Sequence, residues 1–347
     1  MEEKPWWIFR GDRTPKPLDP LPASPSWRNY QTRYHQKFGD VVPEIQLPLA
    51  DERGKNYIAD PKQCDLVNTA LLLRRPLLVT GAPGTGKTAL AYAVAYELQL
   101  GPVLLWPITT RTTLQDALYR YDAIGRLQAD AALKNARELG HEQTDSDAAL
   151  KNNIGDFLRL GPLGTALLPS KRARVLLIDE IDKSDIDLPN DLLHIFEEGT
   201  FEIPELARLP KDQSSVQVRT SDEDERATIH NGRVHCYEFP LVVMTSNGER
   251  DFPPAFLRRC LRLEMPDLKD DRPRLDAIIR LQLGMDVDPN DADINNVIAQ
   301  FTDPKKLIAT DQLLNALFLL RNLDNPIDLN APEQSEVSKA VLHPLSQ

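Results

Sequence analysis

Gly81-Ala82-Pro83-Gly84-Thr85-Gly86-Lys87-Thr88 is the stretch of sequence that decides the fold. It fits the pattern G-x-x-x-x-G-K-[ST], with a short apolar run (76–80) before it and an Ala- and Leu-rich segment at helical spacing (88–100) after it. A strand, a glycine-rich turn and a helix in this order are typical of a phosphate-binding loop. Because the glycines let backbone N–H groups point inward at a helix N-terminus, the loop is expected to cradle an anion.

Individual side chains of this loop have separate expected tasks. Lys87 is predicted to reach the β- and γ-phosphates of a nucleoside triphosphate, and the Thr88 hydroxyl to bind Mg²⁺. All eight residues of the motif, and Ala89 behind it, are predicted to bind nucleotide. The alternative, a glycine-rich turn with a chance lysine, is disfavoured by the flanking strand and helix.

Two acidic residues follow a second apolar run, Val175 to Ile178. Asp179 and Glu180 therefore belong at the carboxyl end of a sheet, where open α/β folds bind their ligands. Asp179 suits nucleotide-bound Mg²⁺, and Glu180 suits a base that orients and polarises the attacking water. One acid here could cap a helix, but two beside a phosphate loop predict hydrolysis of a nucleoside triphosphate.

A polar amide ends the next core strand. Asn247 follows the apolar run 241–245, where it could hold the attacking water or the γ-phosphate. A turn residue is the alternative, and the neighbouring motifs favour the catalytic role.

The apolar runs alternate with segments of helical periodicity, which predicts a parallel sheet covered on both faces, a three-layer α/β sandwich. The expected strands lie at 76–80, 103–106, 174–178, 241–245 and 261–263. After Pro266 only helical segments follow, so a small helical lid domain is predicted over 267–347. The large domain is predicted over 51–266.

Two additions to the large domain are expected. A polar stretch at about 126–153 predicts a helical insert. Residues 201–239 alternate apolar and polar side chains around an acidic run, 221–226, which predicts a β-hairpin with a solvated tip.

Residues 1–50 form a Pro-rich extension that carries three of the four tryptophans, Trp6, Trp7 and Trp27. Such a segment favours extended backbone and builds no core alone. Two alternatives remain open: an arm that lays its aromatic side chains on a partner, or an arm folded back on its own domain.

Composition limits the remaining possibilities. The net charge of −11 disfavours a nucleic-acid binder, and no apolar run in the 347 residues reaches the length of about 18 that predicts a membrane span. The N-terminus has no signal-like apolar region. Cys64, Cys236 and Cys260 lack metal-ligand spacing and predict buried thiols in the cytoplasm.

Together these motifs resemble AAA+ ATPases, and within them the MoxR family of the helix-2-insert clade. The resemblance is carried by the phosphate loop, IDEIDKSDIDLPNDLLHIFEEG (178–199), TSN (245–247), FPPAFLRRCLRLEMP (252–266) and GPLGTAL (161–167). It implies ATP and Mg²⁺ as cofactors.

The resemblance also implies a homo-oligomeric ring, usually a hexamer, in which a neighbour's arginine completes each site. Arg259 matches that finger, with Arg258 as its alternative, and surface ion pairing is the competing interpretation. Tyr57 and Ile58 match the adenine pocket, with a core role equally open. The expected sensor 2 arginine is missing from 307–312, and Lys306 is its nearest substitute, although lysine lacks the planar fork of arginine.

The function implied is chaperone-like: ATP hydrolysis drives remodelling or assembly of a protein client, in some members with a von Willebrand factor A domain partner. The alternative is an ATP-dependent oligomeric scaffold or signalling component of a prokaryotic conflict (defence) system. No membrane is expected, and nucleic acid is the least favoured partner.

Overall fold

Five apolar segments form the central sheet of the computed structural model, which describes residues 4–18, 20–39, 41–43, 47–138, 153–284, 291–303, 308–321 and 341. The sheet has the strand order β11-β1-β10-β5-β2, and all of its neighbouring strands are parallel. Its strands are β1 (Leu77–Thr80), β2 (Leu104–Pro107), β5 (Val175–Asp179), β10 (Leu241–Ser246) and β11 (Leu261–Glu264). The predicted α/β fold class is therefore confirmed.

Alternate residues of these strands face two different cores, because side chains of a strand point to opposite faces in turn. Leu77 and Leu177 pack with α2 (Pro61–Leu73) and α3 (Lys87–Leu98). Leu78 and Leu176 pack on the other side. The helices there are α7 (Pro162–Ala166), α8 (Leu188–Glu198) and α10 (Pro254–Arg259). Helices thus cover both faces of the sheet, and the carboxyl ends of its strands are left open for a functional site.

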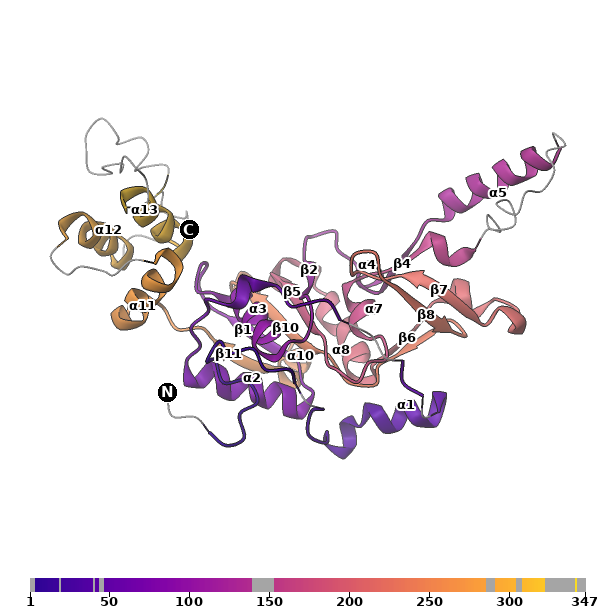
Figure 1. Cartoon of the computed structure of the whole chain (residues 1–347), viewed down its shortest axis with the longest axis horizontal. Coiled ribbons are helices and arrows are strands. Elements are labelled where there is room, and N and C mark those ends of the chain that lie inside the picture. The colour runs from indigo at the N-terminus through magenta and orange to yellow at the C-terminus, as the bar shows by residue number, and fades with distance from the viewer. Residues whose placement is uncertain are drawn as a thin grey trace.

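A second sheet has the strand order β3-β4-β7-β8-β9-β6. Its strands are β3 (Tyr119–Tyr121), β4 (Leu158–Leu160), β6 (Thr200–Glu202), β7 (Ser215–Arg219), β8 (Arg226–His230) and β9 (Arg233–His235). α5 (Ala123–Glu138) projects away from the body beside this sheet (Figure 1). It occupies the first part of the expected insert, and residues 139–152 lie outside the described part.

Residues 223–226 of the acidic run are exposed, as predicted for a solvated tip, and Asp222 is the exception. Asp222 is not solvated: its two carboxylate oxygens each accept a hydrogen bond of 2.8 Å from Arg174, whose side chain is 5% exposed. The bidentate pair holds the β7–β8 connection on the edge of the central domain, because a buried guanidinium needs a charged partner.

The C-terminal helices form a separate small core. α11 (Arg272–Leu283), α12 (Ala292–Thr302) and α13 (Thr310–Arg321) enclose Leu275, Val297 and Leu317. They lie at the opposite end of the molecule from α5 (Figure 1).

The N-terminal arm is folded back on its own domain. Trp7 and Phe9 are 4% and 1% exposed and belong to the core beneath α2 and α3. The arm continues through the short turn η1 (Ser26–Arg28) into α1 (Tyr30–Phe38). Tyr30 stacks on Phe239 at 4.9 Å between ring centroids. Of the two alternatives left open by the sequence, the structure shows docking on the same chain.

The remaining short elements join these parts: α4 (Leu114–Leu118), α9 (Pro204–Ala207), η2 (Glu52–Gly54), η3 (Ile154–Phe157), η4 (Ile181–Lys183) and η5 (Lys211–Gln213). All three cysteines are buried free thiols, as expected. Within the described ranges, helices with the length and apolarity needed to cross a bilayer are absent.

Candidate active site

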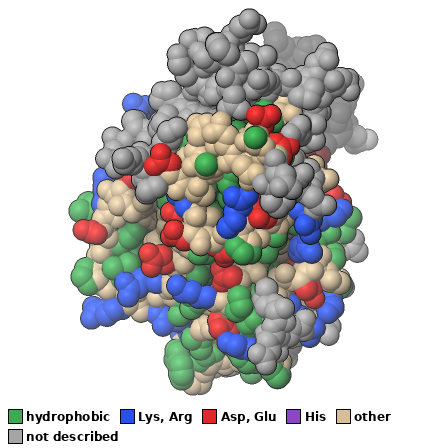
Figure 2. Space-filling view, turned by 90° about the vertical axis from the view of Figure 1, so that its left-hand side faces the viewer, with side chains coloured by type: hydrophobic (Ala, Val, Ile, Leu, Met, Phe, Trp, Pro, Cys, Tyr) green, Lys and Arg blue, Asp and Glu red, His purple; other side chains and the backbone are tan. Residues whose placement is uncertain are grey.

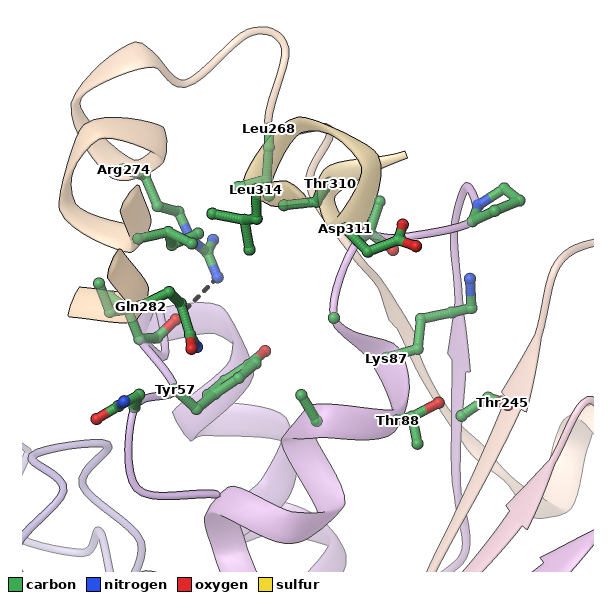
Figure 3. Close-up of a pocket in the computed structure, with 18 of the residues that line it drawn as sticks. Tyr57, Lys87, Thr88, Thr245, Leu268, Arg274, Gln282, Thr310, Asp311 and Leu314 are labelled. Carbon is green, nitrogen blue, oxygen red and sulfur yellow. Dashed lines mark hydrogen bonds between the residues drawn. The ribbon is translucent and has the colours of Figure 1, made fainter. Parts of the chain in front are cut away.

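A cavity of about 480 Å³ lies between the central sheet and the lid helices (Figure 3). The phosphate loop and the ends of β5 and β10 form one wall, and residues of α11 and α13 form another. The segment before α2 closes the third side. Of the residues predicted for the site, twelve line it: Tyr57, Ile58, Pro83, Gly84, Thr85, Gly86, Lys87, Thr88, Ala89, Asp179, Glu180 and Asn247.

The phosphate loop has an anion-binding geometry. Gly86, the residue before α3, lies in the left-handed region (φ +85°) and supplies no side-chain cap, so the first N–H groups of the helix remain available. Gly84 also has positive φ, +78°, and a Cβ there would lie 2.7 Å from the backbone nitrogen of Thr310 on α13. Only glycine permits this close approach of loop and lid.

Lys87 is folded back on its own loop. Its Nζ donates to the carbonyls of Gly81 and Ala82, both at 2.8 Å. These two predicted residues thus hold the lysine without lining the cavity themselves. Burial lowers the pKa of Lys87, and the nearby carboxylates of Asp182 and Asp179 counter that effect. Lys87 itself lines the cavity.

Oxygen atoms suited to Mg²⁺ gather beside Lys87. Asp179 Oδ1 accepts hydrogen bonds from Thr88 Oγ1 at 3.0 Å and from Thr245 Oγ1 at 2.6 Å. A carboxylate and a hydroxyl fit this ion, which keeps several waters and takes phosphate oxygens as further ligands. Within the described ranges there is no cluster of three or more acidic, histidine or cysteine residues for another metal.

Glu180 has a strained backbone at the end of β5. Its φ of +59° is left-handed, which is rare for a residue with a side chain. The Glu180 N–H donates to Thr245 Oγ1 at 2.9 Å, and Lys183 Nζ donates to Glu180 Oε2 at 2.8 Å. Glu180 also lines an adjoining cavity of about 540 Å³, so its carboxylate stands between two open spaces.

Asn247 is held by a residue that the sequence analysis did not single out. Asp182 is 3% exposed, and its Oδ2 accepts the backbone N–H groups of Asn247 (2.9 Å) and Glu249 (3.1 Å). Asp182 and Thr245 thus fix the positions of Asn247 and Glu180. Both residues lie within the quoted motifs, each two positions from a predicted site residue, but the motifs did not indicate which groups they bind.

The far end of the cavity is apolar. Tyr57, Leu268 and Leu314 surround it (Figure 3), and burial raises the pKa of Tyr57. Arg274 of α11 reaches the same place, donating to Asp60 Oδ2 at 2.8 Å and to the carbonyl of Ile58 at 3.0 Å. This geometry suits a flat base next to the phosphate loop.

The role of Arg274 could not be predicted from the sequence, because its partners lie more than 200 positions earlier in the chain. Its Nε is buried without a hydrogen-bond partner in the described part of the chain. Arg274 is thus a lid arginine outside the stretch 307–312, and it lies at the apolar end of the cavity. Lys306, the substitute expected there, lies outside the described residues.

A family model described as "AAA domain (dynein-related subfamily)" matches residues 76–260, just over half of the chain. The chain belongs to this family. With the phosphate loop, Asp179 and Glu180 at one cavity, this AAA domain is an ATP hydrolase.

Solved structures similar to this AAA domain include NtrX from Brucella abortus in complex with ADP, at 12% identity and a TM-score of 0.38 over 82% of this chain and 55% of that one. The AAA domain of FIGL-1 in complex with ADP is 15% identical, with a TM-score of 0.33 over 79% and 74%. PCH-2 of C. elegans is 16% identical, with a TM-score of 0.32 over 80% and 63%. This chain spans little more than half of the NtrX chain. The curated proteins contain no match.

The two candidate finger arginines of this AAA domain lie away from its own cavity. Arg258 and Arg259 end α10 and are not among the residues that line the site. Arg259 Nε pairs with the carboxylate of Glu197 at the end of α8, and Arg75 donates to the backbone carbonyls of both arginines. The Arg259 side chain remains 41% exposed.

Proposed function

We propose that the chain is a MoxR-type AAA+ ATPase that hydrolyses ATP between subunits of a homo-oligomeric ring, a hexamer as is usual in that family, and remodels or assembles protein partners.

 The proposal rests on one observation: the catalytic groups of the chain are divided between its cavity and a separate edge of the molecule. Among the described residues that line the cavity, Lys87 and Arg274 are the cations, and Arg274 is engaged at the base end. The γ-phosphate end therefore lacks an arginine, while Arg259 is exposed on another edge of the same chain.

The residues of the cavity can carry out hydrolysis in the following way. Lys87 exchanges the carbonyls of Gly81 and Ala82 for phosphate oxygens, since a phosphate is the stronger acceptor. Bound Mg²⁺, held by Thr88 and Asp179, would offset the charge of the phosphates. Glu180 takes a proton from the attacking water, and the amide of Asn247 orients that water or the γ-phosphate.

A finger from a second copy would then stabilise the charge that develops on the γ-phosphate oxygens. Such an arginine is worth about 10³–10⁵ in rate. Hydrolysis would depend on assembly, because Arg258 and Arg259 do not line the cavity of their own chain.

The lid supplies a means of converting hydrolysis into movement. The N-terminus of α13 contacts Gly84 of the phosphate loop, and Arg274 joins α11 to the segment before α2. A nucleotide in the cavity touches both domains, so its loss or hydrolysis changes the balance between two lid positions.

The client-binding part is proposed to be α5 with the β7–β8 hairpin, at the end of the molecule remote from the lid (Figure 1). Ile124 and Leu127 of α5 are 70% and 69% exposed, one helical turn apart. Apolar side chains of this kind suit transient contact with a protein. A von Willebrand factor A domain protein is a proposed partner of this surface.

A nucleic-acid partner is less well supported. On the face of the molecule in Figure 2, positive and negative side chains are interspersed over the visible described area. A nucleic-acid backbone favours a continuous basic surface.

The test is a mixing experiment with two inactive variants. Lys87→Ala loses its nucleotide site but keeps Arg259, and Arg259→Ala keeps the nucleotide site but loses the finger. We expect each alone to release phosphate at least about 10²-fold more slowly than the unmodified chain. Mixed in equal amounts they regain part of the activity, because some interfaces pair an intact site with an intact finger. Absence of recovery, with both variants assembled, would refute catalysis between subunits.

A further inference from the structure

Trp27 is the more exposed of the two exposed tryptophans of the arm, Trp6 and Trp27. The arm hides Trp7, Phe9 and Tyr30, which are 4%, 1% and 2% exposed, whereas Trp27 is 73% exposed. It lies on the ordered turn η1, just before α1. Leaving a tryptophan in water forgoes the burial of roughly 150–250 Å² of mostly apolar surface.

Contacts within the chain place Trp27 on the same edge as the candidate finger. The Trp27 carbonyl accepts a hydrogen bond from Arg33 Nη2 at 3.5 Å, and Arg33 Nη1 donates to the carbonyl of Glu197 at 2.9 Å. The carboxylate of Glu197 in turn pairs with Arg259. Three contacts thus connect the arm's exposed tryptophan with the arginine proposed to act on another subunit.

A second route gives the same placement. Arg28, the residue after Trp27, donates from Nη1 to the carbonyl of Arg74 at 2.8 Å. The next residue, Arg75, holds the carbonyls of Arg258 and Arg259. The arm and the end of α10 therefore form one continuous surface, which we call the finger edge: Trp27, Arg28, Arg33, Arg75, Arg258 and Arg259.

We infer that Trp27 docks on a second copy of this chain and positions Arg259 at that copy's ATP site. This inference rests on the proposed function, which requires Arg259 to come within hydrogen-bonding distance of a neighbour's γ-phosphate. Because three contacts connect Trp27 with Arg259 on the same edge, an interface that brings Arg259 to a neighbouring copy also brings Trp27 to that copy.

Charge supports a second copy as the occupant. The finger edge carries five arginines beside two carboxylates, those of Glu197 and Glu198, which pair with Arg259 and Arg33, so positive charge prevails there. The cavity that it would face is lined by the acidic side chains Asp179, Glu180 and Asp311 and would hold a triphosphate. Opposite charge guides the two surfaces together, and a central tryptophan is a typical anchor of such an interface.

Assembly of Trp27→Ala tests the inference, with Trp6→Ala as the matched control. Trp6 is also an exposed arm tryptophan, 42% exposed, but it lies at the other end of the arm, with its ring 6.0 Å from Lys4 Nζ. Assembly with ATP is measured by sedimentation in a Glu180→Gln background, which limits turnover. We expect Trp27→Ala to need about 10-fold more protein for half-assembly, Trp6→Ala to change this less than about 2-fold, and Trp27→Phe to recover most of the loss.

Mixing pairs of variants then tests on which side of the interface Trp27 acts. Trp27→Ala combined with Lys87→Ala is expected to regain ATPase activity, because the damage lies on opposite sides of the interface. Trp27→Ala combined with Arg259→Ala is expected to regain none, because both changes lie on the finger edge.

The possible results separate this inference from the proposed function. If the unmodified chain assembles and Trp27→Ala assembles equally well, or if the Arg259→Ala mixture recovers, the inference is overturned and the ring ATPase stands. If the unmodified chain hydrolyses ATP as a monomer, both are overturned. Thermal unfolding is measured for the three tryptophan variants. A midpoint equal to that of the unmodified chain establishes that each variant remains folded.

Discussion

Glu180 combines a strained backbone with a carboxylate between two cavities, and its substitution tests the assignment of the base. Glu180→Gln keeps the size of the side chain but removes the group that accepts a proton. We expect ATP to bind within about 3-fold of the unmodified affinity, while phosphate release falls by roughly 10²–10⁴-fold, the usual contribution of a general base. Binding is measured with a fluorescent ATP analogue and turnover by phosphate release at saturating ATP.

Glu249→Gln is a suitable control at the same scale. Glu249 lines the adjoining cavity with Glu180 but does not line the cavity that contains the phosphate loop. The Glu249→Gln variant should hydrolyse ATP at the same rate as the unmodified chain. Unimpaired phosphate release by Glu180→Gln would exclude this residue as the base.

For single residues, the sequence predicted where a side chain lies better than it predicted which groups that side chain contacts. Lys87, Thr88, Asp179 and Glu180 meet at one cavity because a motif of fixed spacing and a strand end place them there. The role of Asp182 could not be predicted, since two N–H groups after β10 reach its carboxylate across 65 and 67 positions.

At the scale of elements, the arm is joined to α2 and α3 by two buried polar side chains. Asn68 is fully buried, and its amide accepts from the N–H groups of Ile8 and Phe9 and donates to the carbonyl of Phe9, all at 2.7–2.9 Å. Glu97 accepts three more backbone N–H groups, from Arg10, Gly11 and Arg13. In the described part of the chain the arm has no neighbouring strand, so these two side chains supply the hydrogen-bond partners that its backbone groups would otherwise find in one.

Asn68→Ala is therefore expected to lower the free energy of unfolding by about 2–3 kcal/mol. The substitution leaves buried backbone groups of the arm without partners, and each unsatisfied group costs on the order of 1–3 kcal/mol. Urea unfolding followed by tryptophan fluorescence measures the change, because Trp7 lies in the same contact region.

Thr69→Ala on the same helix provides the comparison. The Thr69 hydroxyl donates to the carbonyl of Asp65 within α2, so its loss should cost less than about 1 kcal/mol. Equal stabilities of Asn68→Ala and Thr69→Ala would show that the arm is not held through Asn68.

Among the elements, the strands of the central sheet were predictable and the docking of the arm was not. Runs such as 175–178 are apolar at every position, which indicates a strand buried on both faces. The arm has no such periodicity. Its place depends on Asn68 and Glu97, which lie about 60 and 87 positions away from their partners and resemble ordinary helix residues in the sequence.

At the scale of the whole molecule, the lid and the central domain are joined through Arg274. Its guanidinium, anchored on α11, binds Asp60 and Ile58 of the segment that enters α2. The Arg274 and Asp60 side chains are 11% and 24% exposed, so solvent weakens this pair less than a surface ion pair. A lid held in this way keeps Leu268 and Leu314 over Tyr57 and closes the apolar end of the cavity (Figure 3).

Arg274→Met should loosen this closure while leaving the phosphate loop intact. Hydrogen bonds to charged groups contribute about 1.5–3 kcal/mol, so we expect ATP to bind roughly 10-fold or more weakly and the lid to be cleaved faster in limited proteolysis. Arg272→Met is the matched control, because Arg272 lies on the same helix and pairs with Asp276 one turn away on α11. Inorganic triphosphate, which has no base, should bind Arg274→Met and the unmodified chain alike. If ATP binds both arginine variants with equal affinity, the lid does not contribute to nucleotide binding through Arg274.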